Sequence, residues 1–230
     1  MFRAGMSVLV VVCVLGLAAP AVFADTLYFD FGDEPYHTTG NYNNIDWHQN
    51  PIADCVNDSG NNTGIALDVY DAFYTTSANN NGTQSPFGDA AMFDAMATRD
   101  SLYGCVQEWY GQAQPTAGFR LTGLDPSLTY DFTIFASRLS VSDNREAQYD
   151  ITGLNGGTAY LNSVGNSSEV VMITGISPTP GGEIVVDVQP GPNNNNSYGF
   201  YYLGAMKMSF VPEPASLTFL LLGVALLRRR

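Results

Sequence analysis

The feature of this chain that most constrains its fold is a period-two pattern of apolar side chains. Between residues 130 and 136 every second side chain is apolar, and polar Asp131 and Thr133 separate the first three. Successive side chains point to opposite faces of an extended chain, so this pattern predicts a strand with one buried face. The run Asp125-Pro126-Ser127, which is typical of a turn, precedes it.

Similar segments recur along the chain between clusters of Gly, Pro and Asn. We expect further strands over residues 26–31, 65–70, 119–122, 147–152, 158–161, 169–174, 183–188 and 199–210. Only residues 88–98 have a helical pattern, and that segment is short. Many short strands at this spacing are typical of a sandwich. The sequence therefore predicts a single all-β sandwich over residues 25–210.

The part of the chain between its two ends is strongly acidic. Residues 25–211 contain 21 acidic side chains and five basic ones, which gives a net charge of −16. Nucleic acids and anionic lipids are bound by basic surfaces, so this charge argues against both as partners of the domain. It is compatible with neutral glycans and with divalent cations.

The first 24 residues predict a secretory signal peptide. Arg3 gives a positive start, and residues 8–17 form an apolar run. Val22-Phe23-Ala24 then supplies a cleavage pattern, so the mature chain is expected to begin at Asp25. Cys13 lies inside the apolar run and not at the cleavage point, which argues against a lipoprotein anchor.

The last twenty residues combine three features in order. Pro212-Glu213-Pro214 precedes thirteen mostly apolar residues, 215–227, and Arg228-Arg229-Arg230 follows them. A helix of thirteen residues is about 20 Å long, shorter than the ~30 Å hydrocarbon core of a membrane. Snorkelling arginine stems and local thinning of the bilayer offset part of that deficit, and the three arginines favour a cytoplasmic C-terminus.

This order of features resembles the PEP-CTERM sorting signal. The resemblance implies a bacterial protein whose tail is a transient membrane anchor, removed by an exosortase that recognises Pro212, Glu213 and Pro214. The implied partners before processing are the export machinery, the exosortase and the membrane. A permanent tail anchor is the alternative. In both cases residues 25–211 are expected outside the cytoplasmic membrane, at the cell envelope or released from it.

Two passages resemble the galactose-binding-like, or jelly-roll, fold. They are Phe29-Asp30-Phe31-Gly32 and the longer stretch 121–153, which contains Gly123-Leu124-Asp125-Pro126. The resemblance implies a jelly-roll sandwich, a fold often used to bind glycans. Strands joined by such turns also occur in fibronectin-like modules, and the jelly roll hosts purely structural domains as well.

Cys55 and Cys105 are the cysteines left after removal of the signal peptide. An even number of cysteines in an oxidising compartment predicts one disulfide. It would close a loop of about fifty residues and stabilise the fold by about 3–4 kcal/mol. Two separate buried thiols are the alternative. Neither cysteine has a histidine or second cysteine nearby in sequence, which argues against a metal-binding or catalytic role.

Two of the five basic residues of the domain lie at the two ends of one predicted loop between strands. Arg138 and Arg145 flank this loop, and Asp143 and Asn144 lie between them. These side chains are candidates for the polar edge of a sugar site, because they form directed hydrogen bonds with hydroxyls. The alternative is an Arg–Asp latch that fixes the connection between the strands.

The aromatic candidates are the two tryptophans and Tyr110. Aromatic faces stack on the C–H surfaces of sugars, which makes Trp109 and its neighbour Tyr110 a candidate platform. Trp47, in the polar segment 43–48, is a second one. Large aromatics also dominate protein cores, so burial is the alternative, foremost for Trp109.

An oxygen-rich run over residues 54–62 makes calcium the one cofactor to consider, with Asp54 and Asp58 as candidate ligands. The spacing does not match an EF-hand loop, and a glutamate is missing from its end. A solvated loop rich in Asp and Asn turns is the alternative.

The sequence contains no motif that identifies an enzyme. His37 and His48 are its only histidines, and it has neither Gly-x-Ser-x-Gly nor His-Glu-x-x-His. We therefore expect a non-catalytic, surface-sorted matrix protein that contacts polysaccharide. One alternative is a purely structural surface protein, which would leave no open groove carrying Trp or Tyr. The other is a glycan hydrolase, which would need a cleft with two carboxylates.

Overall fold

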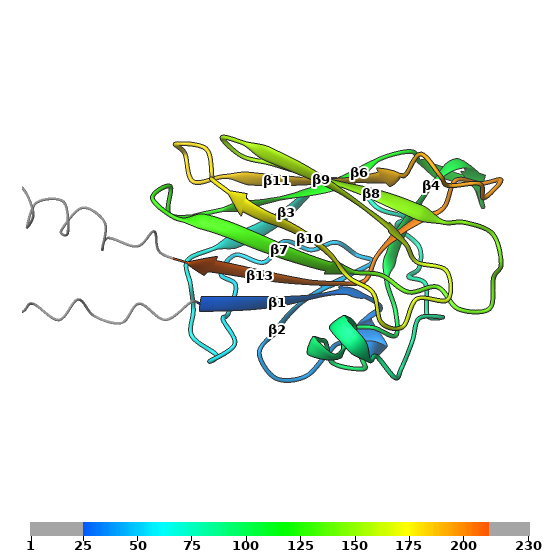
Figure 1. The fold of residues 1–230 in the computed structure, drawn as a ribbon, viewed down its shortest axis with the longest axis horizontal. Helices are drawn as coiled ribbons and strands as arrows, with labels where there is room; N and C mark the ends of the chain where they lie inside the picture. The colour runs from blue at the N-terminus through cyan, green and yellow to red at the C-terminus, as the bar shows by residue number, and fades with distance from the viewer. Residues whose placement is uncertain (1–24, 212–230) are drawn as a thin grey trace, which may run out of the picture.

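Two five-stranded sheets pack face to face in a β-sandwich (Figure 1). The computed structural model describes residues 25–211, and the expected signal peptide and sorting tail lie outside the described residues. The prediction of an all-β sandwich is confirmed. Within residues 25–211 no helix is both long and apolar enough to cross a membrane.

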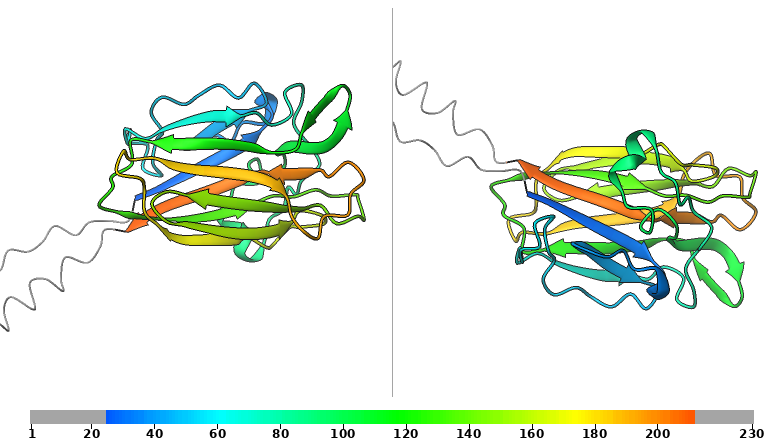
Figure 2. Two further views of the ribbon diagram at one scale, coloured as in Figure 1. Left: turned by 90° about the horizontal axis from the view of Figure 1, so that it is seen from above. Right: turned by 90° about the horizontal axis from the view of Figure 1, so that it is seen from below.

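Figure 2 shows the two layers from above and from below. Sheet A has the strand order β10 (Val171–Ile176), β7 (Thr129–Phe135), β13 (Ala205–Val211), β1 (Asp25–Gly32) and β2 (Tyr42–Asp46). Sheet B has the order β3 (Ala66–Asp71), β6 (Ala117–Thr122), β11 (Ile184–Pro190), β8 (Glu146–Thr152) and β9 (Gly156–Asn162). Strands β1 and β2 are parallel, and the other pairs in these two sheets are antiparallel.

Three further strands form a third sheet at one end of the sandwich. They are β12 (Tyr201–Leu203), β4 (Leu102–Trp109) and β5 (Gln112–Gln114), in that order. Two 3₁₀ helices complete the described elements, η1 (Glu34–Tyr36) and η2 (Gly88–Met92).

The core lies between the two large sheets. In β1 the side chains of Leu27, Phe29 and Phe31 are fully buried, as a period-two strand with one buried face requires. Phe31 packs against Phe119 of β6 with ring centroids 5.2 Å apart, so this pair connects the two sheets. Such aromatic pairs contribute about 0.5–1.5 kcal/mol beyond the area that they bury.

The helix predicted over residues 88–98 is wrong beyond its first turn. Only η2 is helical, and the chain turns at Phe93 to pack on the outer face of sheet A (Figure 2). The ring of Phe93 lies 6.1 Å from that of Phe135 in β7 and meets Tyr28 of β1 edge-on at 6.3 Å. These tertiary contacts favour an irregular chain that follows the sheet over a regular helix.

The strand predicted over residues 199–210 is divided at Gly204. The N–H of Gly204 donates to the carbonyl of Phe135 at 3.1 Å, and its carbonyl accepts from the N–H of Phe31 at 2.7 Å. Residues before this point pair with β4, whereas residues after it pair with β7 and β1. Gly204 is therefore where the chain passes from the small sheet into sheet A.

The predicted disulfide is wrong, because Cys55 and Cys105 are two separate buried thiols. Each is held by its own local pairing. The N–H of Cys55 donates to the carbonyl of Ile65 at 2.7 Å, whereas the thiol of Cys105, on β4, faces the carbonyl of Gln112 at 3.7 Å. Burial raises the pKa of Cys55 to about 12 and raises that of Cys105 as well. Both thiols are therefore protonated and unreactive in the folded domain.

The chain enters and leaves the sandwich at the same end. Asp25 at the start of β1 pairs with Phe210 near the end of β13, and Figure 1 shows the start of β1 and the end of β13 side by side at the left. The register of β7 on β13 runs from Thr129 opposite Val211 to Phe135 opposite Ala205. The loop that follows Phe135 therefore lies at the far end of the sandwich, away from both termini.

Candidate functional site

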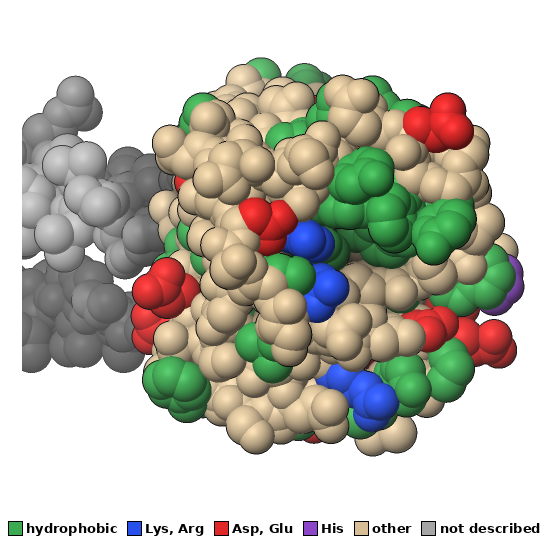
Figure 3. All heavy atoms as spheres, turned by 90° about the vertical axis from the view of Figure 1, so that its right-hand side faces the viewer, with side chains coloured by type: hydrophobic (Ala, Val, Ile, Leu, Met, Phe, Trp, Pro, Cys, Tyr) green, Lys and Arg blue, Asp and Glu red, His purple; other side chains and the backbone are tan. Residues whose placement is uncertain are grey.

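A hollow of about 220 Å³ opens at the far end of the sandwich. Figure 3 shows hydrophobic side chains gathered around it, with basic and acidic side chains at its border. The residues that line it come from the segment before η2, from β4, from the loop between β7 and β8, and from β12 and the residue before it. They are Ala78, Asn79, Tyr103, Trp109, Arg138, Arg145, Phe200 and Tyr202.

One wall of the hollow is aromatic. Trp109 is partly buried and meets Phe200 edge-on, with ring centroids 5.4 Å apart and planes at 82°. Tyr103 packs on the same Phe200 ring at 5.8 Å. Burial raises the pKa of Tyr103 to about 12, so its phenol stays protonated at any physiological pH. The wall thus offers apolar ring surface held in place by several contacts.

Arg145 lies beside this wall, with its guanidinium carbon 5.3 Å from the centroid of the Phe200 ring, and it forms the predicted pair with Asp143, which does not itself line the hollow. Nε of Arg145 lies 3.1 Å from each carboxylate oxygen of Asp143, and its Nη1 donates to the Tyr202 hydroxyl at 2.5 Å. Burial would raise the pKa of Asp143, but hydrogen bonds from Asn196 and Arg145 outweigh it and hold that pKa below its usual value. Arg145 is therefore both the latch considered from the sequence and a lining residue of the hollow.

Arg138 lies beside the same tyrosine. Its Nη1 donates to the carbonyl of Leu139, and its backbone N–H donates to the carbonyl of Ser163 at 2.7 Å. Burial raises the pKa of the Tyr202 phenol, and the guanidinium groups of Arg145 and Arg138 oppose that rise. Two cationic side chains therefore converge on one hydroxyl at the wall of the hollow.

The asparagine run between β11 and β12 shapes this end of the sandwich. Oδ1 of Asn196 accepts from the backbone N–H of Phe200 at 3.2 Å, and the amide of Asn194 donates to the Phe200 carbonyl at 2.8 Å. Oδ1 of Asn195 accepts from the N–H of Asn144 at 2.7 Å. The run therefore fixes Phe200 and ties the β11–β12 loop to the loop that carries the arginines. Asn144 contributes its backbone here and does not line the hollow.

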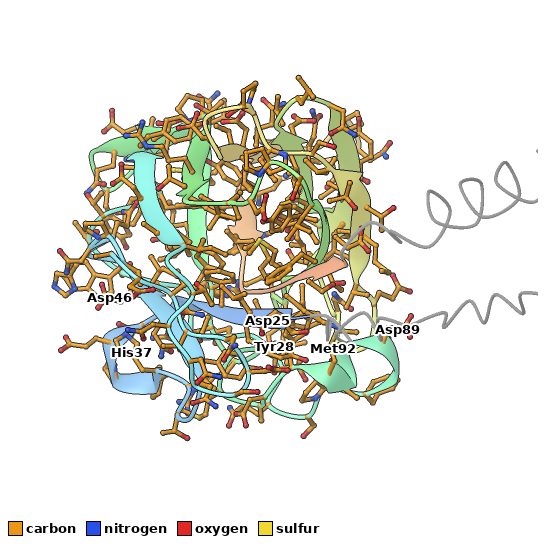
Figure 4. The ribbon with its side chains drawn as sticks, turned by 90° about the vertical axis from the view of Figure 1, so that its left-hand side faces the viewer. Asp25, Tyr28, His37, Asp46, Asp89 and Met92 are labelled. Carbon is orange, nitrogen blue, oxygen red and sulfur yellow. The ribbon has the colours of Figure 1, made fainter. Side chains whose placement is uncertain are left out.

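Tyr110 and Trp47 are the aromatic candidates that lie outside the hollow. Tyr110 is 84% exposed at the β4–β5 turn, with its ring edge-on to Trp109 at 4.8 Å. Trp47 stacks on His48 with ring centroids 3.7 Å apart, in the loop after β2. There His48 and His37 both contact Asp46, at 3.1 and 3.6 Å, and Figure 4 labels His37 and Asp46 on this side.

The structure does not gather the calcium candidates into a cation site. Oδ1 of Asp54 accepts the N–H groups of Gly64 at 2.8 Å and of Thr63 at 3.2 Å. Asp58 contacts the hydroxyl of Ser59 at 3.4 Å. Nowhere in residues 25–211 do three or more His, Cys, Asp or Glu side chains come together in a way that could hold a metal ion.

No protein-family model matches this sequence. No curated protein sequence is significantly similar to it. Among solved structures, the ANXUR1 extracellular domain from Arabidopsis thaliana is 11% identical with a TM-score of 0.39, over 58% of this chain and 38% of that chain. TmCBM61 in complex with β-1,4-galactotriose is 10% identical with a TM-score of 0.24, over 50% of this chain and 68% of that chain.

The F5/8 type C domain of a Bacteroides fragilis protein is also 10% identical, with a TM-score of 0.25, over 47% of this chain and 90% of that one. This chain matches only about two fifths of the length of the ANXUR1 domain. Similarities at this level assign no family, so the functional argument rests on the hollow itself.

Proposed function

We propose that the domain is a non-catalytic carbohydrate-binding module with a jelly-roll sandwich, and that the hollow binds a sugar unit of an extracellular polysaccharide. The observation that carries this proposal is the pairing of the Trp109–Phe200 wall with the guanidinium groups of Arg138 and Arg145. Ring faces pack on sugar C–H groups, while guanidinium N–H groups donate to hydroxyls. The volume is below the ~300–1,000 Å³ typical of sites for drug-sized ligands, which suits one sugar unit or a chain end.

The lining of the hollow also favours binding over the two alternative functions. Hydrolysis of a glycoside needs two carboxylates beside the scissile bond, and the residues that line the hollow include none. A purely structural domain was expected to leave no open groove carrying Trp or Tyr, whereas this hollow is lined by Trp109, Tyr103 and Tyr202.

The position of the hollow fits the proposed surface sorting. In that proposal residues 1–24 direct export and residues 211–230 form a transient membrane anchor that an exosortase removes. Val211 ends β13 at the end of the sandwich opposite the hollow. A chain held at the envelope by its C-terminus would therefore present the hollow outward, toward surrounding polysaccharide.

Replacing Trp109 by alanine is expected to weaken saccharide binding at least tenfold, because it removes the largest ring surface of the hollow. The measurement is a glycan array on residues 25–211, with and without calcium, followed by calorimetry on the best ligand. Tyr160→Ala is the matched control, since Tyr160 is an aromatic residue of β9 that is 47% exposed and does not line the hollow. Thermal unfolding of each variant verifies that it is folded. Absence of any glycan binding by the unmodified domain would contradict the proposal.

The proposed sorting predicts a defined mass for the protein recovered from its native cell envelope and medium. We expect a chain that begins at Asp25 and ends near residues 212–214, with or without an added surface group. Because both thiols are free, reduction should leave the mass unchanged. Retention of residues 215–230 would show a permanent anchor and would contradict exosortase processing, whereas a gain of about two daltons on reduction would reveal a disulfide.

A further inference from the structure

The hollow is lined by basic side chains, whereas the domain as a whole is acidic. Residues 25–211 carry a net charge of −16, and two of their five basic residues line this one site. Of the other basic residues, Arg120 is paired with Asp68 at 2.8 Å on sheet B, and Arg99 lies over the ring of Tyr36. Asp143 is the acid that pairs with a basic residue of the hollow, and no acidic side chain lines it. The site therefore carries net positive charge.

That positive charge belongs to Arg138. Arg145 is paired with Asp143 and also bonded to Tyr202, so its positive charge is already balanced within the protein. Arg138 forms no ion pair within residues 25–211, and its side chain contacts only neutral groups, the carbonyl of Leu139 and the hydroxyl of Tyr202. A guanidinium has five N–H donors, so the contacts with Leu139 and Tyr202 leave other donors of Arg138 available at the wall of the hollow.

Two hydrogen bonds fix the main chain of Arg138 at the wall of the hollow. Its N–H donates to the carbonyl of Ser163 at 2.7 Å, and its carbonyl accepts from the N–H of Gly165 at 3.0 Å. A half-buried cation without a counter-ion costs free energy, and a bound anion would recover it. A planar carboxylate matches the fork of N–H groups on a guanidinium better than a single hydroxyl does.

We infer that the sugar unit bound in the hollow is a carboxylated one, a uronic acid of an acidic polysaccharide, with its carboxylate on Arg138 and its ring on the Trp109–Phe200 wall. This inference rests on the proposed saccharide binding and names the class of sugar. The negative charge of the whole domain repels a polyanion at long range, but at 0.15 M salt that repulsion is screened beyond about 8 Å. Short-range contact with Arg138 then decides the preference.

The test compares uronic acid oligosaccharides with their methyl esters, which keep the ring and the hydroxyls but lose the charge. Oligogalacturonate and oligoglucuronate, each with its ester, are titrated calorimetrically into the domain at 0.15 M salt. We expect at least a tenfold preference for one of the acids over its ester. Arg138→Gln should abolish that preference, because the charge that distinguishes the acid from its ester then has no partner in the hollow. Arg120→Gln, which removes the same charge from the outer face of sheet B, should leave the preference intact.

Each other outcome is decisive. Equal affinity for acid and ester, or an unchanged preference in Arg138→Gln, would overturn the inference while the proposed saccharide binding stands. No binding of any oligosaccharide, acidic or neutral, would overturn both. If Arg138→Gln fails to fold, Arg138→Lys serves instead, because it keeps the charge but loses the fork, and the preference should then fall without disappearing.

Discussion

Replacing Asp100 by asparagine is expected to stabilise the domain by about 2–4 kcal/mol at pH 9 and by only about 1 kcal/mol at pH 5. The side chain of Asp100 is 1% exposed, and its carboxylate occupies the place over β1 where a Cβ on Gly32 would stand. One carboxylate oxygen accepts from the N–H of Asp33 at 2.6 Å, and the other has no partner among the described residues. The charged groups around it are Asp30 on β1, Asp33 and Arg99.

The direction of this effect follows from the pKa of Asp100. Burial first, and then repulsion from Asp30, raise that pKa from 3.8 to about 8. The folded domain therefore retains a proton that the unfolded chain releases above about pH 4. The contribution of Asp100 to the free energy of unfolding is therefore most favourable below about pH 4, and it is lost as the pH rises from about 4 to 8. At roughly 1.4 kcal/mol per pKa unit the full loss is about 5–6 kcal/mol, and relaxation around the ionised group reduces it.

Asparagine imitates the protonated acid without being able to ionise, and its carbonyl oxygen can still accept the N–H of Asp33. The measurement is urea unfolding of both proteins at pH 5, 7 and 9. Asp89→Asn is the matched control, because Asp89 is an exposed acid of η2 and its loss changes the net charge equally (Figure 4). A wild-type stability that is constant between pH 5 and 9 would show that Asp100 is ionised at little cost, contrary to this argument.

The parts of the fold that were predictable are those where local pattern and tertiary environment agree. Strand β7 alternates because one face of it meets the core, and the same holds for β1, β8 and β11. Strand β2 was not predicted, since Ile45 is its one aliphatic side chain and its other residues are polar or tyrosine. It is a strand because β1 offers it a parallel edge, and a local pattern cannot reveal such a partner.

Some residues of the candidate site could also be predicted from the sequence, and others could not. The rarity of basic residues singled out Arg138 and Arg145, and the structure places both at one hollow. The residues Phe200 and Tyr202 were missed, because they had been included in one long strand and nothing in the sequence indicates the break at Gly204. Trp47 was also an aromatic candidate, but it stacks on His48 in the loop after β2 and does not line the hollow.

The second large effect is expected from replacing Gly104 by alanine, which should destabilise the domain by about 3 kcal/mol. Gly104 lies on β4 directly opposite Tyr201 of β12, and the tyrosine ring covers the glycine. A Cβ at Gly104 would come closer than 3.0 Å to the phenol oxygen and two ring carbons of Tyr201. Tyr201 cannot move away easily, because it is fully buried and its hydroxyl donates to the carbonyl of Gln114 at 3.0 Å.

The matched control for this variant is Gly181→Ala. The nearest atom to a Cβ there is the hydroxyl of Thr179 at 3.7 Å, an ordinary contact, so the change should stay within about 0.5 kcal/mol. Chemical unfolding gives both values. Because β4 also carries Tyr103 and Trp109, displacing Tyr201 should weaken saccharide binding as well as the fold. If Gly104→Ala unfolds at the same denaturant concentration as Gly181→Ala, the three-stranded sheet adjusts to the added Cβ at little cost. The claim that the aromatic wall of the proposed binding site is rigid would then be wrong.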